Sequence, residues 1–131
     1  MMCYAYSALD AGAWAFTAEA TSFAGFPIQS AGNQNDAISF KLFLQRGTYT
    51  LRYLHKKGNN HGIAKFKLDG TSKGTIDSYA AVASLNNISS ITNISVPHTG
   101  LYTLQLIVDA KNVASTAYFA NFVSISMFRT A

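Results

Sequence analysis

The stretch GTYTLRYL, residues 47–54, recurs half a chain later as GLYTLQLI, residues 100–107. Each copy begins with a glycine, which suits a turn, and continues as an alternating run of aromatic, β-branched and polar residues. Such a run is typical of a strand in an antiparallel sheet that buries one of its faces. The repetition therefore predicts two equivalent long strands in an all-β protein, an antiparallel β-sandwich of the jelly-roll kind.

Further strands are predicted on both sides of these two segments. Residues 36–44 and 63–68 alternate apolar and polar side chains in the same way. The pair Asp69-Gly70, which follows the second of these runs, is a strong signal for a tight hairpin. Other strands are expected near residues 14–18, 74–77, 94–96 and 118–129, with loops at 23–35, 78–93 and 109–116.

A single core is expected to collect the inward-facing side chains of these strands. It comprises Trp14, Phe16, Ile38, Phe40, Leu42, Tyr49, Leu51, Tyr53, Phe66, Leu68, Ile76, Leu104, Leu106, Val108, Val123, Ile125 and Met127. The prediction depends on the phase of each strand, because a shift of one residue exchanges its two faces.

Length and composition favour one domain with an unusually uncharged surface. Residues 1–131 are expected to form a single jelly-roll domain, and residues 1–12 could form a mobile arm ahead of the first strand. Hydrophobic residues make up 49% of the chain and charged residues 12%, about half the usual charged share. Small polar side chains or a neighbouring subunit must therefore cover much of the surface.

Several strands are apolar on both faces, and the second face points to self-association. A sheet of a two-layer sandwich normally shows water one polar face, so a second apolar face needs a cover. Another copy of the same chain is the simplest cover, which favours a closed homo-oligomer. The predicted interface residues are Phe43, Leu101, Ile107, Phe122 and Phe128.

The chain lacks the sequence signatures of catalysis and of metal binding. No Gly-x-Ser-x-Gly segment occurs, and Cys3 is the only cysteine, so no intrachain disulfide can form. His55 and His61 are expected to be exposed loop residues, since two histidines without a third ligand make a poor metal site. We therefore expect a protein that is not an enzyme and that holds no metal and no cofactor.

The charges and the hydropathy pattern limit the partners. The net charge of +4 arises from scattered lysines, which gives little support to a nucleic-acid partner. The basic residues on one predicted hairpin, with Arg52 on the strand that leads into it, are typical of a solvated edge strand; the lysines are Lys56, Lys57, Lys65, Lys67 and Lys73. An acidic partner, such as an anionic glycan, a nucleic acid or a neighbouring subunit, is an alternative. No stretch is long and apolar enough for a membrane helix, and no secretory leader is visible, so we expect a soluble chain without membrane insertion.

The order and spacing of short segments carry a family resemblance: NDAISF at 35–40, GTYTL at 47–51, GI at 62–63, LDG at 68–70, GTIDSY at 74–79, and residues 111–130. Together they resemble the head domains of phage tail fibres and other virion appendages, which are similar to trimeric jelly rolls of the tumour-necrosis-factor type. The resemblance implies a homotrimer located in the virion, with a structural or receptor-binding role. Other virion proteins and host-surface glycans are its implied partners.

The GTYTLR strand at 47–52, the LDG hairpin at 68–70 and a closing strand near Asn121 also carry a weaker resemblance. They resemble β-sandwich carbohydrate-binding modules, which hold sugars with aromatic side chains and loop Asn or Asp residues. This resemblance implies Tyr79, Tyr118 and Asn121 as ligand-binding residues, with Asn59 and Asn60 as further hydrogen-bonding groups. Trp14 could also serve, but its phase with Phe16 assigns it to the core. The preferred hypothesis is thus a non-enzymatic trimeric viral head, and the alternative is a monomeric carbohydrate-binding module.

Overall fold

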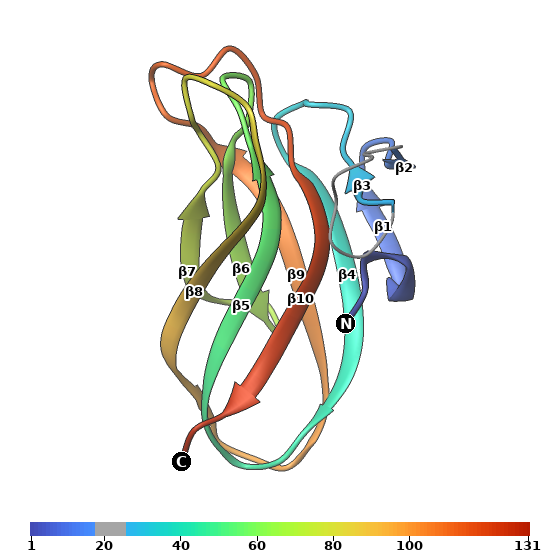
Figure 1. Cartoon of the computed structure of the whole chain (residues 1–131). Coiled ribbons are helices and arrows are strands. Elements are labelled where there is room, and N and C mark those ends of the chain that lie inside the picture. The colour runs from blue at the N-terminus through green and yellow to red at the C-terminus, as the bar shows by residue number, and fades with distance from the viewer. Residues whose placement is uncertain (18–25) are drawn as a thin grey trace.

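In the computed structural model, which describes residues 1–17 and 26–131, ten strands form two facing five-stranded sheets (Figure 1). Sheet A has the order β2-β3-β10-β5-β8 and sheet B the order β1-β4-β9-β6-β7, and all strand pairs are antiparallel. The predicted antiparallel β-sandwich of the jelly-roll kind is confirmed. The elements are the 3-10 turn η1 (Cys3–Ala5), β1 (Ala8–Ala11), β2 (Ala15–Phe16), β3 (Ile28–Gln29), β4 (Asp36–Leu44), β5 (Gly47–Lys57), β6 (Ile63–Leu68), β7 (Thr71–Asp77), β8 (Ser84–Val96), β9 (Gly100–Ala110) and β10 (Asn121–Arg129).

The two copies of the repeated sequence become interior strands of opposite sheets. Strand β5 pairs with β10 and β8 in sheet A, and β9 pairs with β4 and β6 in sheet B. Each copy also repeats one side-chain contact. The hydroxyl of Tyr49 donates to the carbonyl of Gln45 at 2.7 Å, and that of Tyr102 donates to the carbonyl of His98. In both copies the tyrosine thus fastens its strand to the turn before it.

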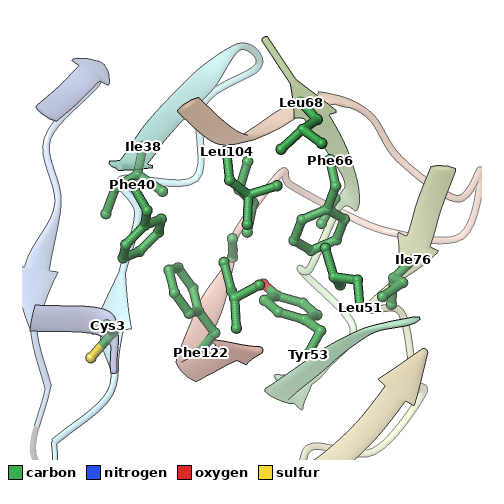
Figure 2. Close-up of a cluster of buried hydrophobic side chains, with 14 of the residues drawn as sticks. Cys3, Ile38, Phe40, Leu51, Tyr53, Phe66, Leu68, Ile76, Leu104 and Phe122 are labelled. Carbon is green, nitrogen blue, oxygen red and sulfur yellow. The ribbon is translucent and has the colours of Figure 1, made fainter. Parts of the chain in front are cut away.

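The core lies between the sheets and is built around four fully buried aromatic rings (Figure 2). Phe122 lies in the middle, with its ring centroid 6.2 Å from that of Phe40 and 5.5 Å from that of Tyr53. Tyr53 also meets Phe66 edge-on at 5.1 Å. Burying one such side chain contributes roughly 1.5–3 kcal/mol, so the four together form a large part of the core. Trp14 packs against Phe122 and belongs to this core, as predicted.

Most of the predicted core is buried, and the exceptions lie near the strand ends. Phe16 is 52% exposed because β2 is a two-residue strand at the edge of sheet A. Leu42 and Met127 are only half-buried and pack against the core from its margin.

The prediction that Phe122 lies in an oligomer interface is wrong, because a β-bulge changes the phase of β10. Phe122 pairs with His55 and Ser124 pairs with Leu54, so Val123 is an extra residue on β10. Phe122 belongs to the core cluster together with Ile125, and Val123 is buried as well. A strict alternation across this point assigns Phe122 to the wrong face.

The other predicted interface residues lie on outer faces but not on one surface. Phe43 and Leu101 are each 66% exposed and sit opposite one another on sheet B. Ile107 is half-buried on the same sheet. Phe128 is 46% exposed on the outer face of sheet A, on the other side of the sandwich from Phe43 and Leu101.

Three segments form strands that the sequence analysis did not place. Strand β8 starts at Ser84, inside the predicted loop 78–93, and β3 lies inside the predicted loop 23–35. Strand β1, within the segment considered as an arm, pairs with β4. Ala18 and residues 23–25 lie outside the described residues. No helix among the described residues is long and apolar enough to span a membrane.

Candidate functional site

Four loops meet at one end of the sandwich, at the top of Figure 1. They are residues 30–35, 58–62, 78–83 and 111–120, and they connect β3 to β4, β5 to β6, β7 to β8 and β9 to β10. We call this set of loops the apex. It contains four of the five predicted ligand-binding residues, Asn59, Asn60, Tyr79 and Tyr118.

Backbone hydrogen bonds join the apex loops to the central loop 58–62. Gly58 N donates to Ser78 O at 3.0 Å, and Gly62 N donates to Phe119 O at 2.9 Å. Phe119 N in turn donates to Asn60 O at 3.1 Å. In a regular strand, backbone N–H and C=O groups bond to the neighbouring strands of the sheet. Here these groups bond from loop to loop and hold three loops in fixed positions.

Gly62 permits the closest approach in this arrangement. A Cβ at this position would lie 2.3 Å from Cγ1 of Val108 and 3.2 Å from Cα of Tyr118. Any side chain at position 62 would therefore push the loop away from β9 and from Tyr118.

The two predicted tyrosines are both half-buried and both adjoin the central loop. Tyr79 forms an isolated bridge with Gly58, and its backbone N donates to Oδ1 of Asp77 at 2.9 Å. The backbone N of Tyr118 donates to the carbonyl of Gly32 at 3.1 Å. Lys111 Nζ lies 5.9 Å from the centre of the Tyr118 ring. The backbone of each tyrosine is thus held by neighbouring loops, and each residue remains partly exposed.

The predicted amides occupy different environments. Asn59 is exposed, and its carbonyl accepts a bond from Thr116 N at 3.0 Å. Oδ1 of Asn60 lies 2.9 Å from Nδ1 of His61. Asn121 is 1% exposed at the start of β10, where its Nδ2 donates to Oε1 of Gln29 at 2.9 Å. Asn121 therefore supports the fold from below the apex, apart from the other four residues.

The expectation that His55 and His61 are exposed loop residues is wrong, because both are buried. The two ring nitrogens of His55 lie 2.9 Å from the hydroxyls of Ser78 and Ser89. Burial and the nearby charge of Lys57 lower the pKa of His55 to about 3. The alternation of Leu51, Tyr53 and His55 along β5 was the signal that could have placed His55 inside.

His61 is part of the central loop, and the centroid of its buried ring lies 6.2 Å from that of Phe119. Burial, followed by the charge of Lys56, lowers the pKa of His61 to about 4. Both histidines are therefore neutral at neutral pH, and they act as polar packing groups beneath the apex.

A second candidate surface is a groove of about 150 Å³ on the outer face of sheet A. Its lining residues come from β5, β8 and β10: Arg52, Leu54, Ile88, Ser124, Ser126 and Phe128. The guanidinium carbon of Arg52 lies 4.9 Å from the centre of the Phe128 ring. We call this the sheet-A groove.

A third hollow, of about 450 Å³, lies at the opposite end of the sandwich, between the β6–β7 hairpin and the β8–β9 turn. Its main polar groups already serve the fold. Oδ1 of Asp69 accepts a bond from Thr103 N at 2.8 Å, and the Tyr102 hydroxyl donates to His98 O. This hollow therefore offers fewer uncommitted groups than the apex.

Comparison with known proteins supports the second resemblance. No known family and no curated protein matches the sequence. A Paenibacillus xanthan lyase matches with 25% identity and a TM-score of 0.82, over 98% of this chain and 13% of that chain. The CBM36-1 domain of a multidomain xylanase from the Trinervitermes trinervoides hindgut metagenome matches with 18% identity and a TM-score of 0.68, over 99% of this chain and 95% of that chain. A CBM36 carbohydrate-binding module in complex with calcium and xylotriose matches with 11% identity and a TM-score of 0.70, over 98% of each chain.

These comparisons show that the chain has the β-sandwich fold found in carbohydrate-binding modules. The prediction of a trimeric viral head is wrong, since the matching full-length structures are modules of this other class. The segments that suggested it, such as Leu68-Asp69-Gly70, form strands and turns. Strand and turn residues specify a sandwich, whatever function the sandwich carries. The chain spans 13% of the xanthan lyase and thus corresponds to one segment of that enzyme.

The described residues do not fit the calcium found in one of these structures. Among residues 1–17 and 26–131, no group of three or more His, Cys, Asp or Glu side chains could hold a metal ion. The carboxylate of Asp77, at the end of β7 beside the apex, accepts bonds from Tyr79 N and, at 3.2 Å, from Asn112 Nδ2. Calcium sites usually include several carboxylates among their six to eight oxygen ligands, and the described residues offer no such group here.

Proposed function

We propose that this chain is a non-catalytic carbohydrate-binding module that holds a glycan at the apex. The observation that carries the proposal is the attachment of Tyr79 and the Tyr118–Phe119 segment to the same central loop. Two loops that each carry a tyrosine are thereby attached to the same loop. Aromatic rings carried by loops of fixed backbone suit the apolar C–H face of a sugar.

Polar groups near the rings would provide the hydrogen bonds that orient a sugar. The amide of Asn59 is exposed, and Lys111 lies beside Tyr118. These groups belong to the same loops, so they keep their positions relative to the tyrosines. The fold shared with the CBM36 and CBM6 modules supports the same assignment.

A non-catalytic role fits the distribution of the described carboxylates. Glycoside hydrolysis uses two carboxyl groups that flank one bond. Here each described aspartate bonds a different part of the fold: Asp10 with Gln105, Asp36 with Asn33, Asp69 with Thr103, Asp77 with Asn112 and Asp109 with Lys65. We infer binding without bond cleavage.

The test is binding of uncharged glycans, first on an array and then by titration calorimetry with the best ligand. We expect the double substitution Tyr79→Ala, Tyr118→Ala to weaken binding about tenfold or more, through the loss of stacking. The matched control is Tyr4→Ala, which removes a 66% exposed tyrosine on η1. Unchanged affinity in the double variant would contradict the site, and an array without any bound glycan would contradict the function.

A further inference from the structure

The two sheets differ sharply in charge. The strands of sheet A contain four basic residues and no Asp or Glu: Arg52, Lys56 and Lys57 in β5, and Arg129 in β10. The strands of sheet B contain as many lysines as aspartates: Lys41, Lys65, Lys67 and Lys73 against Asp10, Asp36, Asp77 and Asp109. The net charge of +4 therefore matches the charge of the sheet A strands alone. A surface with one sign of charge attracts ligands of the opposite sign.

Arg52 places one of these charges inside the sheet-A groove. It is exposed on the outer face of β5, between Ser126 of β10 and Ser90 of β8. Among the described residues it forms no ion pair, and its guanidinium lies over the ring of Phe128. This cation–π contact limits the movement of the side chain, and a guanidinium without an ion pair can bind a carboxylate bidentately.

The rest of the groove suits a sugar ring. Ile88 is 65% exposed and pairs with Leu54, so the two side chains form an apolar pair on a sheet face that meets solvent, and Phe128 lines the same groove on the other side of Arg52. The hydroxyls of Ser124 and Ser126 line the same groove. A pyranose offers one apolar C–H face, hydroxyls at its rim and, in a uronic acid, one carboxylate. The groove offers apolar side chains for the C–H face, two serine hydroxyls for the sugar hydroxyls and the Arg52 guanidinium for the carboxylate.

We propose that the outer face of sheet A binds an anionic polysaccharide whose sugars carry carboxylates, with one carboxylate on Arg52 and the sugar ring against the apolar side chains Leu54 and Ile88 of the groove. This is a second site, on a different face from the apex, and it does not depend on the apex binding a glycan. A nucleic acid fits less well, because single strands are held by successive aromatic platforms and the groove has one ring.

The first test compares polygalacturonate with the same polymer after its carboxylates are reduced to alcohols. Affinity electrophoresis and calorimetry should show that the full chain binds polygalacturonate and binds the reduced polymer at least about tenfold more weakly. Binding to polygalacturonate should also weaken as salt rises, since exposed charges are screened. Equal affinity for the two polymers would overturn the proposal.

The second test removes the charge and the ring separately. Arg52→Gln and Phe128→Ala should each weaken binding to polygalacturonate about tenfold, with circular dichroism and melting temperature checking the fold. Lys41→Gln is the matched control, because it removes one exposed positive charge from the outer face of sheet B. A loss of equal size in Lys41→Gln would show attraction by net charge alone and overturn the site.

Two further measurements separate this site from its alternatives. The double variant Tyr79→Ala, Tyr118→Ala should bind polygalacturonate as the unsubstituted chain does, whereas Arg52→Gln should keep any affinity for uncharged glycans at the apex. Tighter binding of a twenty-nucleotide oligothymidylate than of polygalacturonate, abolished by Arg52→Gln, would assign the groove to nucleic acid and overturn the proposal.

Discussion

The imidazole of His55 lies nearly parallel to the ring of Tyr53, with the ring centroids 4.4 Å apart and the planes inclined by 22°. Both residues are on the inward face of β5, so the aromatic cluster of the core extends along this strand toward the apex. There the two ring nitrogens of His55 meet the hydroxyls of Ser78 and Ser89. One buried polar residue thus connects the core with the loops of the candidate site.

Acidification should destabilise the protein through its two buried histidines. Their pKa values are about 3 for His55 and about 4 for His61, below the ordinary value of 6.5. Between pH 6.5 and pH 4 the unfolded chain therefore binds more protons, and the free energy of unfolding falls as the pH falls. Each histidine should contribute about 1 kcal/mol per pH unit in the lower part of this window. Urea unfolding at pH 7.5, 6 and 5 measures the effect.

The matched variants for this prediction are His55→Gln and His98→Gln. The first removes a buried imidazole and should flatten the pH dependence, whatever it does to stability at pH 7.5. The second changes an exposed residue of the β8–β9 turn and should leave the pH dependence as it is. A free energy of unfolding that stays constant from pH 7 to pH 5 would show that the histidines are not held neutral by burial.

Gly70→Val should destabilise the β6–β7 hairpin through the backbone alone. Asp69 and Gly70 have φ values of +48° and +84°, as a two-residue hairpin turn requires. No atom lies within 4 Å of a Cβ built at Gly70, so the added side chain meets no clash. Strain in the left-handed region should cost roughly 1–3 kcal/mol, measured by urea unfolding. Gly70→Asn should cost less, because asparagine tolerates this region, and equal losses for both variants would argue against the strain.

Phe122→Ala should be among the most damaging single substitutions in the core. Phe122 is fully buried and contacts the rings of Trp14, Phe40 and Tyr53, so we expect a loss of about 3–5 kcal/mol in the free energy of unfolding. The control Phe43→Ala removes a ring that is 66% exposed and should change stability by about 0.5 kcal/mol or less. Similar losses in the two variants would mean that β10 lacks the bulge that turns Phe122 inward.

Gly62→Ala should loosen the apex as well as lower stability. The new Cβ would lie 2.3 Å from Cγ1 of Val108, and relieving this overlap must shift the central loop, at a cost of roughly 1–3 kcal/mol. Glycan affinity should fall in parallel, since Tyr118 adjoins the same point. Adding Val108→Ala should restore part of the affinity by making room. Gly100→Ala is the control, because no atom lies within 4 Å of its Cβ position, and it should behave as the unsubstituted chain.

The fold class was predictable because the long interior strands carry a regular alternation. In β5 and β9 every second residue is apolar, and each strand buries that face. Only residues 94–96 of β8 were predicted as a strand, and the rest was missed because β8 lies at the edge of sheet A and is mostly polar, with Asn86 and Asn93 at positive φ. The bulge at Val123 was missed for another reason, since one inserted residue changes the phase without any change in composition.

The candidate site was predictable in part. Tyr79, Tyr118, Asn59 and Asn60 follow from the presence of aromatic and amide residues in expected loops, and the structure brings these loops together. Their meeting depends on backbone bonds, such as Gly62 N to Phe119 O, that no side-chain pattern reveals. Asn121 was misplaced because β10 begins at that residue and buries it. Arg52 and Phe128 share a groove only because β5 and β10 are neighbours in sheet A.

The unequal charges of the two sheets give the molecule a dipole moment that runs through the thickness of the sandwich. The field of a negatively charged matrix, such as a layer of anionic polysaccharide, exerts a torque on this dipole. The molecule therefore arrives with sheet A toward the matrix and sheet B toward the solution. The long axis of the strands then lies along the matrix, and the apex points sideways. A molecule adsorbed in this orientation leaves its apex loops accessible to a second polymer chain that runs beside the chain bound by sheet A.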